Sequence, residues 1–148
     1  MTVDKEQVLR GSPLFEMLSA AELEILAEVS RPLRFAAGEL VFREGDQGDS
    51  LYVLARGEVE VVAGADGKGP VLATLATPSA FGEMSLIDRE VRSATVRAKG
   101  ECVALQLTAE NFTAFRKRSR DGFTLFLVNV ARVLSSRLRE TNQKLARR

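Results

Sequence analysis

The sequence contains no histidine and only one cysteine, Cys102. Histidine is the side chain best suited to proton transfer near neutral pH, and it is the commonest metal ligand in proteins. Without histidine, and with one thiol, zinc, haem and iron–sulfur sites lack their usual ligands. We therefore expect no metal site, no cofactor and no catalytic residues, so the composition argues against an enzyme.

Long apolar runs are absent too. No segment approaches the ~18 consecutive apolar residues of a membrane span, and residues 1–6 lack the basic and apolar regions of a signal peptide. A single cysteine allows no internal disulfide and suits a reducing compartment. Because Cys102 lies in an apolar, strand-like run, we expect a buried and unreactive thiol. These features predict a cytoplasmic protein.

The charge is distributed unevenly along the 148 residues. Residues 1–109 hold 11 Lys and Arg against 17 Asp and Glu, whereas residues 110–148 hold 10 against 3, so the C-terminal part carries a charge of +7. A basic segment of this kind contacts nucleic acid or an acidic protein surface in some proteins. We favour the simpler interpretation, a solvated helix face, and consider nucleic-acid binding unlikely to be its role.

The pattern of residues predicts helices at both ends and strands between them. Ser19 and Glu22 have capping-box spacing, so a helix is expected from there to about Val29. From 31 to 107, short apolar runs alternate with turn residues, which is typical of a β-sandwich or barrel. The predicted strands are 33–36, 40–43, 51–55, 59–63, 71–75, 96–98 and 102–107.

Two helices are predicted after the strands. Thr108 is placed to cap the first, and Asp121 is expected to cap a longer one that runs to about Ala146. Apolar positions in the long helix alternate by four and three residues, which is a short heptad seam with a threonine in one position. The seam residues are Leu127, Ala131, Leu134, Leu138, Thr141 and Leu145. A seam this short is compatible with a homodimer and with packing on the chain's own barrel.

The most informative stretch is 81–96, Phe-Gly-Glu-Met-Ser-Leu-Ile-Asp-Arg-Glu-Val-Arg-Ser-Ala-Thr-Val. Gly82 lets the backbone approach a ligand closely, and a short helix from Glu83 would aim free N–H groups at an anion. Arg92, nine residues later, can bind an anion with its fork of donors. Glu83 cannot serve the same anion, so it is expected to face a neutral donor such as a sugar hydroxyl.

This stretch resembles the phosphate-binding cassette of the cyclic-nucleotide-binding domain family, which includes catabolite activator proteins, protein kinase A regulatory subunits and nucleotide-gated channels. The matching positions are Phe81, Gly82, Glu83, Met84, Ser85, Leu86, Arg92, Ser93, Ala94, Thr95 and Val96. Val91 departs from the pattern, because many members carry proline there. Glycine turns at Gly45 and Gly57 extend the likeness, which covers about residues 14–138.

The resemblance implies a mainly β fold with flanking helices: an eight-stranded jelly-roll β-barrel followed by a long C-terminal helix. In one structural domain, we expect an N-terminal helical segment at 1–30, the barrel at 31–107 with its cassette at 81–96, and C-terminal helices at 108–148. A protein with this fold is expected to be a receptor that transmits ligand occupancy through its C-terminal helices. Because members of the family often dimerise through the long helix, the resemblance favours a homodimer.

The resemblance also implies roles for individual residues. Glu83 would accept a hydrogen bond from the ribose 2′-hydroxyl of a 3′,5′-cyclic nucleotide, and Arg92 would pair with its phosphate. Backbone N–H groups near Met84, Ser85 and Ser93 would complete the anion site. The remaining predicted site residues are Phe81, Gly82 and Ala94 in the cassette, Leu72 and Leu75 as an apolar shelf for the base, and Arg137 as part of a helical lid, with Leu138 and Thr141 as further lid candidates.

The ligand's base is left open at this point. Ser93 could contact a guanine amino group, but serine also occurs there in bacterial cAMP receptors, so cAMP is favoured over cGMP without being decided. A cyclic di-GMP-binding domain or a ligand-free regulatory and dimerisation module are alternatives. The chain is expected to be either a stand-alone receptor or a fragment of a longer protein, such as a Crp/Fnr-like transcription regulator or an ion channel, and the effector is unknown.

Overall fold

Three short helices open the computed structural model, which describes residues 3–147: α1 (Lys5–Arg10), η1 (Pro13–Phe15) and α2 (Ala20–Val29). The predicted capping box at the start of α2 is confirmed, since the Ser19 hydroxyl accepts from the Glu22 N–H at 3.1 Å and the Glu22 carboxylate accepts from the Ser19 N–H at 2.9 Å. Two of the free N–H groups at the helix start are thereby satisfied.

Eight strands follow and form two antiparallel four-stranded sheets. They are β1 (Arg31–Phe35), β2 (Leu40–Phe42), β3 (Ser50–Arg56), β4 (Glu58–Val62), β5 (Val71–Ala76), β6 (Ala80–Phe81), β7 (Thr95–Ala98) and β8 (Cys102–Thr108). One sheet has the order β1-β8-β3-β6 and the other β2-β7-β4-β5. The predicted jelly-roll barrel is confirmed. The two-residue strand β6 was not predicted, because so short a segment has no periodicity to recognise.

The apolar residues divide into two clusters. One lies between the two sheets and includes Tyr52 and Phe81, whose rings stack with centroids 5.4 Å apart. The other lies between the helices and the β1-β8-β3-β6 sheet and is centred on Phe15, Phe115 and Phe126. Cys102 is buried in the first cluster, and burial raises the pKa of its thiol. The expectation of a buried thiol is therefore confirmed.

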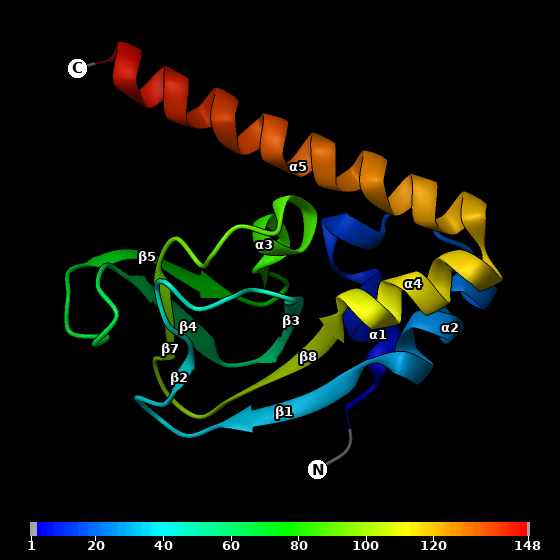
Figure 1. Cartoon of the computed structure of the whole chain (residues 1–148), viewed down its shortest axis with the longest axis horizontal. Helices are drawn as coiled ribbons and strands as arrows, with labels where there is room; N and C mark the ends of the chain where they lie inside the picture. Colours follow the sequence, from blue (N-terminus) through cyan, green and yellow to red (C-terminus); the bar gives the residue numbers. More distant parts are fainter. Residues whose placement is uncertain (1–2, 148) are drawn as a thin grey trace.

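Three helices complete the chain: α3 (Glu83–Asp88), α4 (Ala109–Arg118) and α5 (Arg120–Ala146). Figure 1 shows α3 between the barrel and α5, and α4 beside α2 and the start of α5. Thr108 caps α4 as predicted, in a capping box with Asn111. The prediction that Asp121 caps the long helix is wrong. Ser119 does so, because its hydroxyl accepts from the Gly122 N–H at 3.0 Å, and Asp121 lies in the first turn.

Ser119 also ties the junction of α4 and α5 to the N-terminal helices. Its hydroxyl donates to Glu22 Oε2 at 2.6 Å. This hydrogen bond, together with that from the Ser19 N–H, lowers the pKa of the Glu22 carboxyl. A lowered pKa means that the ionised form stabilises the fold at neutral pH, and that this contribution is lost as the pH falls through the lowered value. The hydrogen bond between Ser119 and Glu22 thus fixes the start of α5 to the first turn of α2.

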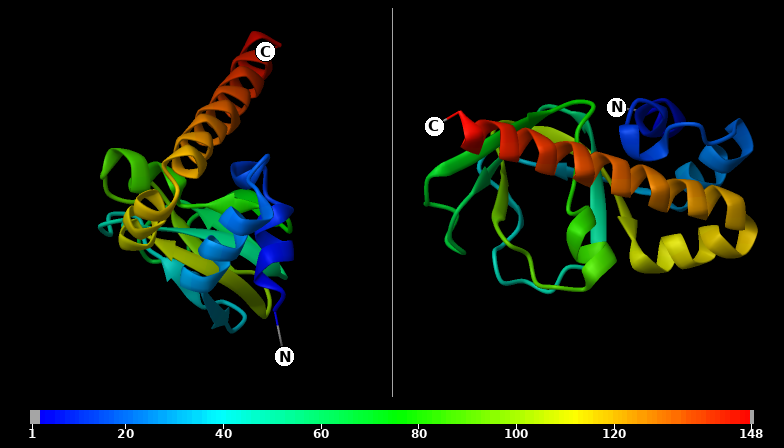
Figure 2. Two further views of the ribbon diagram at one scale, coloured as in Figure 1. Left: turned by 90° about the vertical axis from the view of Figure 1, so that its right-hand side faces the viewer. Right: turned by 90° about the horizontal axis from the view of Figure 1, so that it is seen from above.

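The second half of α5 has little support from the rest of the chain. All of its described residues from 135 to 147 are exposed, and the views in Figure 2 show the helix extending away from the barrel towards its C-terminal end. Leu138 and Leu145 of the predicted seam are 63% and 58% exposed. Within residues 3–147, none of the helices combines the length and the apolar content that a membrane crossing requires.

The first half of α5 is fixed to η1 by a buried amide. Asn129 is 1% exposed, and its Nδ2 donates to the backbone oxygens of Leu14 at 3.1 Å and of Glu16 at 2.9 Å. Its own Oδ1 is buried without a hydrogen-bond partner in the described structure. The two bonds therefore position α5 relative to the N-terminal segment, at the cost of one unsatisfied acceptor.

We expect Asn129→Ala to lower the free energy of unfolding by about 2 kcal/mol, because two backbone oxygens lose their donor in a largely buried place. Urea unfolding followed by circular dichroism measures this change. The matched control is Asn142→Ala on the exposed part of the same helix, which should change stability by less than about 0.5 kcal/mol. Equal stability of the two variants would contradict this role of Asn129.

Candidate functional site

A cavity of about 290 Å³ lies where α3 and the loop after it meet the barrel and α5. Its walls combine apolar side chains from the strands with three charged residues. The lining residues are Phe42, Val61, Leu75, Ala80, Phe81, Gly82, Glu83, Met84, Ser85, Arg92, Ser93, Ala94, Val96 and Arg137. The predicted helix start at Glu83 is confirmed, and α3 lies at this cavity.

Arg92 is the deepest cation of the cavity and is only 5% exposed. Its Nη1 donates to the Gly82 oxygen at 2.9 Å and its Nη2 to the Ser50 oxygen at 2.7 Å. Its Cζ also lies 4.1 Å from the centroid of the Phe42 ring, a cation–π contact. Burial lowers the pKa of the guanidinium, with nearby acidic groups opposing the shift. Arginine nevertheless stays protonated in proteins, so the site holds a permanent positive charge.

Glu83 is the buried anion of the cavity, 3% exposed. Its Oε1 forms an ion pair with Nη1 of Arg137, which reaches in from α5. The Nη2 of Arg137 lies 3.5 Å from the Ala80 oxygen. Because the Arg137 side chain is half exposed while the Glu83 side chain is buried, this pair joins the solvent-facing helix to the interior of the barrel. Arg137 thereby closes one side of the cavity.

Two glycines leave room for the Arg92 guanidinium. Gly82 precedes α3 with φ of 87°, a left-handed conformation that favours glycine, and a Cβ there would lie 2.8 Å from Arg92 Nη1. Gly48 is buried, and a Cβ there would lie 2.7 Å from Ser85 Oγ and 2.8 Å from Arg92 Nε. Real Cβ atoms do not approach that closely, so the position of Arg92 depends on both glycines.

Comparison with known proteins decides the family. A sequence profile described as cyclic nucleotide-binding domain matches residues 32–119, more than half of the chain. This chain belongs to the cyclic nucleotide-binding domain family. The stretch 81–96, which resembles the family's phosphate-binding cassette and is called the cassette below, lies within the matched residues and supplies most of the cavity lining.

Individual relatives agree with the family assignment. The chain is 33% identical over 138 residues to a cyclic AMP receptor protein of Thermus thermophilus, covering 93% of this chain and 62% of that protein. It is 38% identical over 94 residues to a cAMP-dependent protein kinase regulatory subunit of Schizosaccharomyces pombe, covering 64% and 22%. The crystal structure of the Thermus thermophilus catabolite activator protein superimposes with a TM-score of 0.77 at 32% identity, covering 90% and 62%. The chain thus spans less than two thirds of these relatives.

The structure places the predicted site residues as follows. All of those in the cassette line the cavity, as do Leu75 and Arg137. Leu72 does not: it is 61% exposed and is absent from the cavity wall. Leu72 and Leu75 are three residues apart, so alternation of side chains along a strand puts them on opposite faces of β5, and the pairing of β5 with β4 also shifts register at Leu72.

Sequence reasoning missed several contributors to the cavity. Phe42, Val61 and Val96 line it from three strands, and the backbone oxygen of Ser50 binds Arg92. A signal for Phe42 was present, because it is an aromatic residue at the end of a predicted strand just before the glycine turn at Gly45. There was no such signal for Ser50, because its backbone oxygen accepts the hydrogen bond from Arg92 and any residue has such an oxygen.

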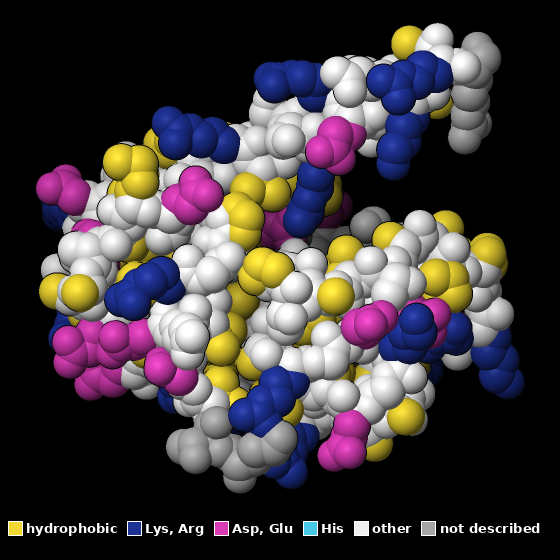
Figure 3. Space-filling model, turned by 180° about the vertical axis from the view of Figure 1, so that it is seen from behind, with side chains coloured by type: hydrophobic (Ala, Val, Ile, Leu, Met, Phe, Trp, Pro, Cys, Tyr) yellow, Lys and Arg dark blue, Asp and Glu magenta, His cyan; other side chains and the backbone are white. Residues whose placement is uncertain are grey.

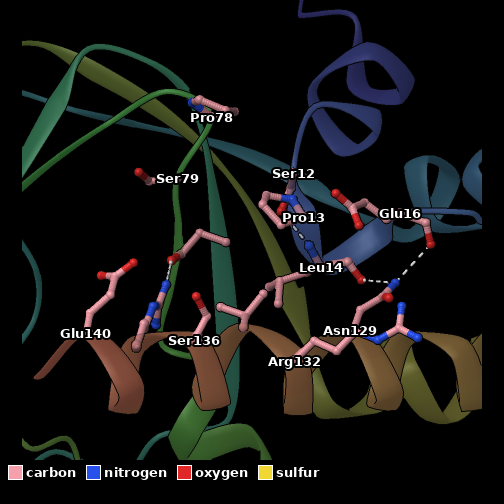
Figure 4. Close-up of a pocket in the computed structure, with 13 residues that line it drawn as sticks. Ser12, Pro13, Leu14, Glu16, Pro78, Ser79, Asn129, Arg132, Ser136 and Glu140 are labelled. Carbon is pink, nitrogen blue, oxygen red and sulfur yellow. Dashed lines mark hydrogen bonds between the residues drawn. The ribbon is translucent and has the colours of Figure 1, made fainter. Parts of the chain in front are cut away.

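A second and larger cavity of about 540 Å³ lies on the other side of Arg137, between α5, η1 and the turn that joins β5 to β6. Figure 3 shows the molecule hollowed beneath α5 on this face. In Figure 4, Ser79, Ser136 and Glu140 lie at one side of this cavity, and Pro13 and Arg132 at the other. Both cavities share Arg137 and Ala80, so Arg137 is part of the wall between them.

The cassette cavity has the chemistry of a binding site. It offers the buried cation of Arg92, the buried carboxylate of Glu83 with its Arg137 partner, and apolar walls, which together suit a singly charged anion that carries hydroxyl groups and a flat apolar part. Among the described residues, no cluster of histidine, cysteine, aspartate and glutamate is arranged to hold a metal ion.

We expect Gly48→Ala to cost about 1–3 kcal/mol of stability, because the new methyl group has no space against Ser85 and Arg92. Chemical denaturation of the purified domain measures the loss. Gly100→Ala is the matched control, since a Cβ there meets no atom within 4 Å. A Gly48→Ala variant as stable as the control would show that the neighbourhood of Arg92 is looser than described.

Proposed function

We propose that this domain is a non-catalytic receptor for a 3′,5′-cyclic mononucleotide, with cAMP favoured over cGMP. The observation that carries the proposal is the pair of buried, oppositely charged side chains, Arg92 and Glu83, in one cavity of the cassette. Names of relatives support cAMP, because the Thermus protein is a cyclic AMP receptor and the yeast protein is a subunit of a cAMP-dependent kinase.

Arg92 would bind the cyclic phosphate. A guanidinium has five N–H donors, and two of them are used by the Gly82 and Ser50 oxygens, which leaves three. The cyclic phosphate carries one negative charge, so one arginine neutralises it. Those backbone bonds and the Phe42 ring hold the guanidinium in place before the ligand arrives, which limits the ordering cost of binding. The N–H groups near Met84, Ser85 and Ser93 would add further donors.

Glu83 would bind the ribose. Its carboxylate is buried in the same cavity as Arg92, so it can accept a hydrogen bond from the 2′-hydroxyl while the phosphate lies on the arginine. Arg137 already pairs with this carboxylate. A bound ribose would therefore either share Glu83 with Arg137 or displace it, and in both cases the ligand would act directly on α5.

The base would lie against the apolar part of the cavity. Val61 and Leu75 provide side chains there, and Arg137, with Leu138 and Thr141 farther along α5, is the lid candidate. The Thr141 hydroxyl donates to the Arg137 oxygen at 3.0 Å. We propose that the lid and Ser93, which lines the cavity, contact the purine, with a preference for adenine.

The C-terminal helices would transmit occupancy. Leu86 of α3 packs against the cluster that contains Phe112 of α4 and Phe126 of α5. A movement of the cassette therefore reaches both helices through direct packing, which is the differential contact that a ligand-driven switch requires. We propose that the protein acts in the cytoplasm and has no catalytic residue, because Arg92 stays protonated and the Glu83/Arg92 pair therefore cannot act as acid and base.

We expect Arg92→Leu to weaken cyclic-nucleotide binding by about 2–5 kcal/mol, as for the loss of one partner of a buried charge pair, which is well over tenfold in Kd. Isothermal titration calorimetry with cAMP, cGMP and cyclic di-GMP measures the affinity and the base preference. Arg34→Leu on the exposed side of β1 is the control and should bind like the unmodified chain. Unchanged affinity in Arg92→Leu, or binding of cyclic di-GMP alone, would refute the proposed function.

We also propose that the domain forms a homodimer through the exposed seam of α5, where Leu138 and Leu145 have no cover from their own chain. A seam of this kind is stabilised when a second helix buries it. Leu138→Glu should therefore shift the sedimentation coefficient in analytical ultracentrifugation from dimer to monomer. Ser135→Glu, exposed but outside the seam, should leave the dimer intact. If the unmodified chain still sediments as a monomer when its concentration is raised 100-fold, the proposed dimer is contradicted.

A further inference from the structure

A groove of about 270 Å³ lies between α3, α4 and the first turns of α5, apart from both cavities described above. Figure 1 shows these three helices next to one another at the junction of the barrel with the helices. Its walls are mainly large apolar side chains and include two arginines, Arg89 and Arg116, but no carboxylate. The groove thus combines apolar side chains with positive charge.

The floor of the groove is buried and aromatic. Phe112 and Phe126 are 4% and 1% exposed, and their rings stack with centroids 4.5 Å apart. Ile87, from the last turn of α3, stands at the rim and is 47% exposed. A preformed apolar depression with an exposed aliphatic rim can accept an apolar side chain without rearrangement, which favours binding because little ordering is required.

The two arginines supply the charge. Both are exposed, and within residues 3–147 neither forms an ion pair with a carboxylate of the chain. Arg89 ends α3 with φ of 59°, in the left-handed region that glycine or asparagine usually occupies at a helix end. The chain therefore places a long cationic side chain at the groove where a small residue would be the ordinary choice.

We propose that this groove docks an acidic amphipathic helix of a partner protein. An apolar side chain of that helix would sit on the Phe112–Phe126 floor, and carboxylates on the same face would pair with Arg89 and Arg116. This is recognition of a helix in a groove, where apolar anchors give affinity and flanking charges give orientation and specificity. A nucleic acid would satisfy the arginines and leave the apolar floor without contacts. The proposal does not depend on which nucleotide the cassette binds.

Selection from a phage-displayed library of random 16-residue peptides tests the proposal on the full chain. The expected result is enrichment of sequences in which aspartate or glutamate flanks a leucine or an aromatic residue at helical spacing. The most enriched peptide, synthesised with a fluorescein label, is then titrated with the protein, and fluorescence anisotropy gives its Kd. Enriched sequences without acidic bias would overturn the proposal.

Three variants locate the binding site. Arg89→Glu and Arg116→Glu should each weaken the labelled peptide at least tenfold, and Ile87→Asp should do so through the loss of the apolar rim. Arg34→Glu, an exposed arginine on β1, is the matched charge-reversal control and should bind the peptide like the unmodified chain. Circular dichroism establishes that each variant is folded, as expected for changes at exposed side chains. Equal affinity for all of these variants would overturn the assignment to this groove.

Co-sedimentation with vesicles of phosphatidylserine and phosphatidylcholine in equal amounts separates a protein partner from a lipid surface. The expected result is that Arg89→Glu and Arg116→Glu leave the fraction of protein that sediments with the vesicles unchanged. Sedimentation lost in Arg89→Glu and Arg116→Glu, with no acidic peptide enriched, would replace the proposed partner by an anionic membrane.

Discussion

The candidate site depends on keeping a guanidinium inside a β-barrel. Desolvation of the Arg92 charge is costly unless its donors are satisfied, and the chain meets this condition with two backbone oxygens and an aromatic ring. Ser50 begins β3 and Gly82 lies between β6 and α3, so the arginine also joins β3 to the start of α3. Glycines at 48 and 82 are required because a side chain would occupy the same space.

The pairing of Glu83 with Arg137 extends this arrangement to the long helix. Without it, α5 would contact the barrel mainly through η1 and α4, by way of Asn129, Ser119 and the phenylalanine cluster. The ion pair adds a contact between α5 and the cassette itself, at the carboxylate that the proposed ribose would use. Glu83 and Arg137 thus serve both the packing of α5 and the proposed binding of the ligand. A change in ligand binding therefore affects the packing of the helix, and a change in packing affects binding.

Much of the fold and of the cavity could be predicted from the sequence, because their signals are local. The capping box at Ser19, the glycine turns and the spacing from Glu83 to Arg92 lie within short stretches, and the structure has the strands and the helix where these stretches indicate. What could not be predicted depends on contacts between distant segments. The Ser119 cap works because Glu22, far away in sequence, holds the hydroxyl. Likewise, the Ser50 oxygen has no side-chain signature, and Arg137 was placed as a lid from its position without any indication of its carboxylate partner.

Because α5 is long, a small rotation where it is attached to the rest of the chain moves its far end by a large distance. The helix has 27 residues, which at ~1.5 Å per residue is about 40 Å. It is fixed near Ser119 and Asn129, Arg137 ties it to Glu83 of the cassette, and its residues from 138 to 146 are exposed. Such a helix acts as a lever: a rotation of about 5° at the supported end displaces the far tip by roughly 3 Å over that length. A rearrangement of side-chain size at the cassette would therefore appear at the C-terminal end as a displacement comparable to the spacing between two residues.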